Sequence, residues 1–175
     1  MKTDELGLPK RKSARLRHYD YREPAAFFVT LCTAERRCLF GHIANHEMHP
    51  SRLGCLVRSA WDRSREHTPH VLWHDMVVMP NHVHGVLQIV TPAQAATREG
   101  FGMPVAGSLS TLMRSFKAAV TLEARKRSLI GPEPLWQGRY YEHLIRCEAD
   151  YLRIVEYMAN NPRQWAEDRF YVRQG

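Results

Sequence analysis

The sequence predicts an α+β domain in which helices pack on one face of an antiparallel β-sheet. Residues 71–90 hold two apolar runs on either side of Pro80-Asn81, a dipeptide typical of a tight turn. Two longer segments, 51–65 and 108–126, carry apolar residues at helical spacing. The elements follow in the order β, α, β, β, α, β, α, and the hairpin requires antiparallel pairing.

Length and composition are those of a single domain spanning 1–175. The chain has 175 residues and 44% hydrophobic content, enough for one core. No apolar run approaches the roughly 18 residues of a membrane span, and the first residues lack the apolar region of a signal peptide. The four cysteines form no Cys-x-x-Cys pair and fit reduced thiols. We therefore expect a cytoplasmic protein that makes no contact with a membrane.

The net charge of +7 favours a polyanionic partner such as nucleic acid. Residues 1–18 contain six basic and two acidic residues and so carry a net charge of +4. Tyr19 and Tyr21 follow this basic arm directly. Arg15 and Arg17 could bind phosphates while the two rings stack on bases. A solubilising tail explains the same composition equally well.

The first elements are a strand and a helix. Residues 26–33 are β-branched and aromatic and predict a buried strand. Residues 51–65 predict an amphipathic helix with Ser51 as its N-cap.

The second strand of the hairpin opens with His82 and His84. Side chains alternate along a strand, so both imidazoles project from one face, roughly 6.6 Å apart. Two histidines on a rigid hairpin supply half of a divalent-metal site. The alternative is a pair of surface histidines on an edge strand.

The helix at 108–126 has an apolar face with a polar flank that includes Arg114 and Lys117. This flank could follow a line of phosphates, or it could be an ordinary solvated surface. Residues 135–146, which include Trp136, Arg139 and His143, predict a turn that enters a strand.

The last predicted helix covers about 150–160. Tyr157 lies about 120° from the centre of its apolar stripe, and Asn161 follows one turn later, before Pro162. A tyrosine in this position can direct its hydroxyl into a cleft, although many such tyrosines only cover the edge of a core.

Several motifs occur in one order along the chain. They are residues 15–21, 79–84, Trp136-Gln137, 141–146, Tyr157 to Pro162, and finally Trp165 and Asp168. This series resembles the HUH single-tyrosine transposases, and most of all their REP-associated branch. The resemblance implies a ferredoxin-like fold and metal-dependent cleavage and rejoining of single-stranded DNA at palindromic or hairpin elements. It also implies a 5′-phosphotyrosine intermediate, in a protein that works as a monomer or homodimer.

The resemblance also implies roles for particular residues. Tyr157 would be the nucleophile, and His82, His84 and Asn161 would bind Mg²⁺ or Mn²⁺. Related enzymes carry glutamine at the position of Asn161. The motifs include Asn81 without giving it a role. We expect the DNA-binding residues to be Arg15, Arg17, Tyr19, Tyr21, Arg114, Lys117, Trp136, Arg139 and His143.

Two other functions fit parts of the sequence. A zinc hydrolase could use His82, His84 and His143 as three ligands around a water molecule. That function leaves Tyr157 and the basic arm unused. A non-catalytic or domesticated DNA- or RNA-binding module could retain the scaffold without the chemistry.

Overall fold

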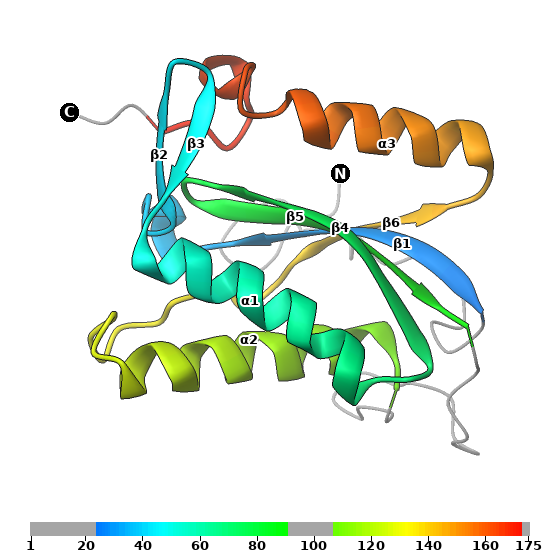
Figure 1. Cartoon of the computed structure of the whole chain (residues 1–175), viewed down its shortest axis with the longest axis horizontal. Coiled ribbons are helices and arrows are strands. Elements are labelled where there is room, and N and C mark those ends of the chain that lie inside the picture. The colour runs from blue at the N-terminus through cyan, green and yellow to red at the C-terminus, as the bar shows by residue number, and fades with distance from the viewer. Residues whose placement is uncertain (1–23, 91–106, 173–175) are drawn as a thin grey trace, which may run out of the picture.

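A computed structural model describes residues 24–90 and 107–172 (Figure 1). The basic arm, with Arg15, Arg17, Tyr19 and Tyr21, lies outside the described residues, as does nearly all of the loop expected at 91–107. The main elements are β1 (Ala25–Cys32), β2 (Gly41–Ala44), β3 (Glu47–Pro50), α1 (Arg52–His67), β4 (Val71–Met79), β5 (His82–Ile89), α2 (Leu109–Lys126), β6 (Tyr141–Ile145) and α3 (Glu148–Asn160). Short 3-10 helices cover Ala34–Arg36 and Trp165–Glu167.

The main sheet is antiparallel, with the strand order β4-β5-β1-β6. Leaving out β2, β3 and α3, the elements follow the β-α-β-β-α-β order of a ferredoxin-like fold. The α+β class and the antiparallel sheet are therefore confirmed. The predicted turn at Pro80-Asn81 joins β4 to β5, as expected.

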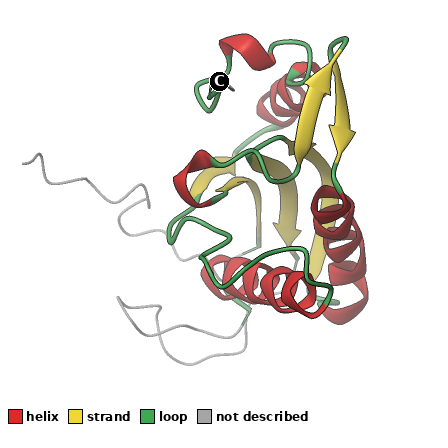
Figure 2. Ribbon diagram, turned by 90° about the vertical axis from the view of Figure 1, so that its left-hand side faces the viewer, coloured by secondary structure: helices red, strands yellow, loops and turns green. Residues whose placement is uncertain are grey.

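The two faces of the sheet carry different layers (Figures 1 and 2). Helices α1 and α2 cover one face and enclose the larger core with alternate residues of β1 and β5. Helix α3 lies over the other face, where Ile154 and Met158 pack on Phe28 and Val86. The prediction of helices on one face of the sheet therefore holds for α1 and α2, whereas α3 lies on the opposite face. The site described below lies on the α3 face.

The sequence placed the starts of α1 and α2 to within one residue. Ser51 and Ser108 are the N-caps of α1 and α2, and their side chains accept hydrogen bonds from the backbone N–H groups of Gly54 and Thr111. Helix α3 begins at Glu148, two residues earlier than expected. In the part of the chain that the structure describes, no helix is both long enough and apolar enough to span a membrane.

The small β2–β3 hairpin was not predicted from the sequence. Its turn residues Asn45 and His46 have φ values of 50° and 63°, as a two-residue hairpin turn requires. The turn and strand predicted over 135–146 correspond to a loop over 135–140 followed by β6. That loop buries Leu135 and Trp136 in the larger core.

Candidate functional site

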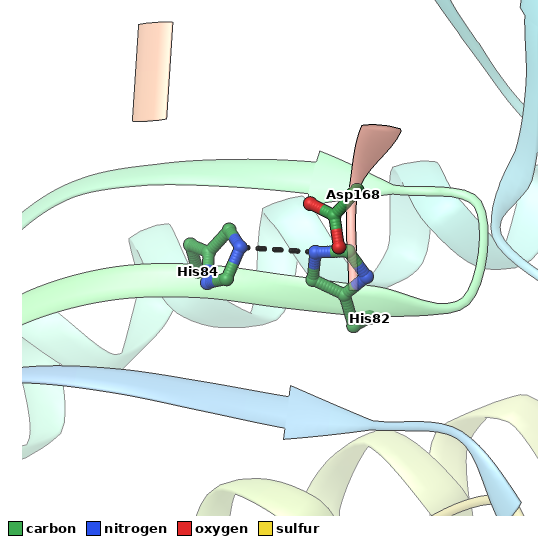
Figure 3. Close-up of side chains that lie close together, drawn as sticks. All are labelled: His82, His84 and Asp168. Carbon is green, nitrogen blue, oxygen red and sulfur yellow. Dashed lines mark hydrogen bonds between the residues drawn. The ribbon is translucent and has the colours of Figure 1, made fainter. Parts of the chain in front are cut away.

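His82 and His84 lie side by side on β5 and face α3, as the strand alternation predicted. Both side chains are fully buried, and their Nε2 atoms are 3.0 Å apart (Figure 3). This separation suits two neighbouring ligands of one cation, each nitrogen about 2.1 Å from it.

Asn81 determines which ring nitrogen of His82 carries the proton. The Asn81 Nδ2 donates to the carbonyl oxygens of Arg36 (3.1 Å) and Phe170 (2.8 Å), so its Oδ1 must face the imidazole. Since Oδ1 can only accept, Nδ1 of His82 donates to it at 2.9 Å. Nε2 of His82 is therefore left with its lone pair directed into the site.

His84 has a more adaptable partner. Its Nδ1 lies 2.9 Å from Oγ1 of Thr30, the residue opposite His84 in the β1–β5 pair. A hydroxyl both donates and accepts, so Thr30 can support either tautomer of His84. The ring of Phe28 stacks on His84 with its centroid 5.1 Å away and fixes the plane of the imidazole.

Burial keeps both imidazoles neutral. Desolvation lowers the pKa of His82 to about 4, although the carboxylate of Asp168 opposes this shift. Burial, followed by the neighbouring His82, lowers the pKa of His84 well below its ordinary value. Both residues therefore offer lone pairs at neutral pH, as metal ligation requires.

Tyr157 reaches the same site from α3. Its hydroxyl oxygen lies 3.3 Å from Nε2 of His84, and its ring packs edge-on against Phe28. The residue is 37% exposed, so part of it is open to solvent. Burial, helped by the charge of Asp168, raises the pKa of Tyr157. Tyr151 on the same helix packs instead against the cluster formed by Phe28, Val86, Ile154 and Met158.

Asp168 completes a group of three possible metal ligands with His82 and His84. The ligand atoms of the three residues lie within 4.8 Å of one another (Figure 3). One carboxylate oxygen of Asp168 accepts from Nδ2 of Asn161 at 2.7 Å, and the other accepts from the backbone N–H of Phe170 at 2.6 Å. The sequence motifs contained Asp168 but did not identify it as a candidate ligand.

Asn161 adds an oxygen that lacks a partner. Its side chain is buried, and among the described residues nothing donates a well-formed hydrogen bond to its Oδ1. It lies close enough to His82 to raise the pKa of that imidazole. An orphaned buried carbonyl oxygen is costly unless a donor or a cation meets it. Two imidazole nitrogens, a carboxylate oxygen and this amide oxygen form a donor set that could hold a divalent cation.

The predicted DNA-binding residues that the structure describes differ in exposure and in contacts. Arg114 and Arg139 are exposed. Lys117 is half-buried, and its Nζ donates to the carbonyl oxygens of Gln137 (2.8 Å) and Arg139 (3.3 Å). It therefore holds the loop before β6.

Trp136 and His143 are occupied by other contacts. The Trp136 ring is 9% exposed and packs against Phe40 and Phe116. The Nε2 of His143 lies 2.8 Å from Oδ2 of Asp150, in the first turn of α3. His143 is not part of the His82–His84–Asp168 group, which leaves the three-histidine zinc site without support.

Comparison with known proteins gives a close relative in sequence. No protein-family model matches the chain. An uncharacterized protein of Haemophilus influenzae is 39% identical over 174 residues, which cover 95% of this chain and 96% of that protein.

Solved structures share the fold at lower identity. A REP-associated tyrosine transposase bound to a REP hairpin aligns with a TM-score of 0.59 and 22% identity, covering 89% of this chain and 76% of that one. A Deinococcus radiodurans protein provisionally described as a transposase aligns with a TM-score of 0.47 and 15% identity, covering 83% and 95%. The second likeness is too weak to support any conclusion.

Proposed function

We propose that this chain, which belongs to the same family as the Haemophilus influenzae protein and has the fold of a REP-associated tyrosine transposase, is an HUH-type single-stranded DNA transposase. The observation that carries the proposal is the position of the Tyr157 hydroxyl, 3.3 Å from Nε2 of His84, on a residue that is 37% exposed. A nucleophile beside a candidate metal site is what phosphodiester exchange requires.

Tyr157 would perform the covalent step. Its hydroxyl oxygen attacks the scissile phosphorus, an O–P bond forms, and the bond from phosphorus to the 3′ oxygen breaks. The phenolic proton ends on the departing 3′ oxygen, so the exchange consumes no proton overall. A 3′ hydroxyl of another strand reverses the reaction and releases the tyrosine. One phosphodiester replaces another, and no ATP is needed.

His82 and His84, with the side-chain oxygens of Asp168 and Asn161, would hold Mg²⁺ or Mn²⁺. A divalent cation bound there would polarise the scissile phosphate and offset the charge that develops on it. Asn81 and Thr30 hold the two imidazoles in place through Nδ1, and Phe28 keeps the Tyr157 ring beside them. The residues are therefore arranged before any substrate arrives.

The proposed substrate is single-stranded DNA that carries a hairpin or palindrome. The chain has a net charge of +7, and the solved structure that it resembles contains a REP hairpin. Arg114, Arg139 and the basic arm at 1–18 would contact the backbone by charge, without reading the sequence.

A denaturing gel tests the proposal. The protein is mixed with 5′- and 3′-labelled hairpin DNA and Mn²⁺, and one labelled strand should migrate with the mass of protein plus DNA. Tyr157→Phe should abolish this band and leave DNA affinity nearly unchanged, because the ring still packs against Phe28. Tyr171→Phe is the matched control, since Tyr171 is similarly exposed (40%) but packs on Trp165.

The competing functions predict other results. A zinc hydrolase would release products without any covalent adduct, and a binding module would shift the DNA in a native gel without cleaving it. An adduct that persists in Tyr157→Phe would contradict the assignment and make Tyr140 or Tyr141 the candidate. EDTA should stop adduct formation, and full activity in the chelator would reject the metal site.

A further inference from the structure

Two arginines from distant segments meet beside the candidate site. The guanidinium carbon of Arg169 lies 4.6 Å from the centre of the Phe170 ring, and that of Arg36 lies 5.5 Å from it. The same Phe170 ring lies 4.6 Å from the His82 ring and 6.2 Å from the His84 ring. Two cations and two candidate metal ligands therefore share one aromatic neighbour.

The backbone of the two segments is tied together. A side-chain nitrogen of Arg36 donates to the carbonyl oxygen of Arg169 at 3.1 Å. Asn81 holds both segments through its bonds to the carbonyl oxygens of Arg36 and Phe170. The arginines are thus placed relative to His82 by hydrogen bonds of the same residue that orients His82.

Neither guanidinium has an acidic partner among residues 24–90 and 107–172. Asp168, the neighbour of Arg169 in sequence, is already bonded to Asn161 and to the N–H of Phe170. The charge of Arg169 acts on His82, His84 and Tyr157, and that of Arg36 acts on His82. The positive charge of the two arginines therefore reaches the site, where the carboxylate of Asp168 opposes it.

We propose that Arg36 and Arg169 form a phosphate clamp at the site, with Arg169 on the scissile phosphate and Arg36 on the adjacent phosphate of the strand. The proposal rests on the proposed transposase function and adds the two residues that would bind the substrate backbone beside Tyr157. Guanidinium groups match phosphate oxygens with paired N–H donors. The guanidinium carbon of Arg169 also lies 4.9 Å from the centre of the Tyr141 ring, a contact that restrains this exposed side chain.

The test compares Arg36→Ala and Arg169→Ala with Arg65→Ala. Arg65 is an exposed arginine in the last turn of α1, on the opposite face of the sheet. The first measurement is the salt dependence of binding to a labelled single-stranded hairpin in EDTA. Each clamp variant should lower the log–log slope by about 0.7, as the loss of one phosphate contact predicts. Arg65→Ala should leave the slope unchanged.

The second measurement is single-turnover adduct formation at saturating DNA. Arg169→Ala should slow it about a hundredfold, as removal of one donor to a developing charge typically does. Arg36→Ala should weaken binding while the rate at saturation stays near that of the wild type. Arg169→Lys should restore the salt slope but only part of the rate, because it keeps the charge and loses the paired donors.

The outcomes separate the clamp from the function. If the wild type forms the adduct and Arg169→Ala matches it in rate and slope, the clamp is rejected and the function stands. If the wild type forms no adduct, the function falls and the salt slopes alone decide the clamp. A folded Arg169→Lys that fails to restore the slope would overturn the phosphate contact.

Discussion

At the scale of single residues, the site depends on hydrogen bonds that fix the orientation and the protonated nitrogen of its imidazoles. The amide nitrogen of Asn81 donates to two carbonyl oxygens, so the amide oxygen must accept from His82. That arrangement sets the His82 tautomer without any charged group. The structure thus accounts for Asn81, which the sequence motifs contained without a role.

Asn81→Ala should weaken Mn²⁺ binding by about 10- to 100-fold, because outer-shell partners of metal-bound histidines typically have effects of that size. The readout is free Mn²⁺ in an electron paramagnetic resonance titration without DNA. Asn81→Asp keeps the acceptor for His82 and loses the donors to Arg36 and Phe170. It should therefore retain more Mn²⁺ affinity than the alanine variant.

Asn160→Ala is the control for this prediction, since Asn160 is a half-buried asparagine at the end of α3. Mn²⁺ binding by Asn81→Ala equal to that of the wild type would show that the tautomer of His82 does not depend on Asn81.

Asp168 and Asn161 should contribute unequally to metal affinity. Asp168 carries a charge and Asn161 is neutral, so Asp168→Asn should reduce Mn²⁺ affinity more than Asn161→Ala does. Raising Mn²⁺ should restore adduct formation to Asn161→Ala but not to His82→Ala. The same titration with each variant measures this order. Wild-type Mn²⁺ binding by Asn161→Ala, with only a lower Tm, would make Asn161 a purely structural residue.

At the scale of elements, β5 must pack closely against α1 to hold the histidines in place. Gly85 follows His84 and faces α1, and a Cβ at this position would overlap the Trp61 ring. The Trp61 ring is locked by Trp73 and Phe116 and by its Nε1 bond to the carbonyl oxygen of His74. It cannot move aside without disturbing the larger core.

Gly85→Ala should lower the free energy of unfolding by about 1–3 kcal/mol, the usual cost of overpacking a core. Urea denaturation measures this cost. Gly138→Ala should be nearly neutral, since nothing lies within 4 Å of a Cβ at that position. Equal stability of the two variants would mean that Trp61 can shift without cost.

Lys117 joins α2 to the loop before β6, and its burial makes stability depend on pH. Burial lowers the pKa of Lys117 from 10.5 to about 8. Below pH 8 both folded and unfolded chains carry the charge, and the folded chain bears the cost of burying it. As pH rises from about 8 to 10.5, the folded chain loses the proton first, so stability increases.

Wild type should therefore gain stability relative to Lys117→Met across this pH window. The difference in free energy of unfolding, measured by urea at several pH values, cancels the titration of cysteines and tyrosines common to both proteins. Lys126→Met, at an exposed position in the last turn of α2, should show no such trend. A flat difference for Lys117→Met would contradict the lowered pKa.

At the scale of the whole molecule, charge is distributed unevenly along the chain. Residues 1–17 hold six basic and two acidic residues, while the candidate site contributes Arg36 and Arg169. A single-stranded substrate could contact both at once. Binding should then weaken steeply with salt.

Deleting residues 1–17 should weaken binding to single-stranded DNA and flatten its salt dependence, by about 0.7 in log–log slope for each lost phosphate contact. Fluorescence anisotropy at several salt concentrations gives the slope. The Tm should not change, since the segment has no apolar pattern of a core element. An unchanged slope would identify the segment as a solubilising tail.

The sequence by itself determined whatever depends on spacing within one element. His82 and His84 share a face because side chains alternate along any strand, and Ser51 and Ser108 cap helices through bonds to residues three positions away. The Pro80-Asn81 turn was predictable for the same local reason.

Only the tertiary structure decided which distant residues meet at the site. Asp168 and Arg36 reach His82 because the C-terminal segment and the loop after β1 fold back on β5, where Asn81 holds them. Trp136 enters the core because the loop before β6 packs there. His143 pairs with Asp150 because the start of α3 lies beside β6. The distance between two elements depends on the joint packing of many side chains, so the spacing of residues along the chain does not specify it.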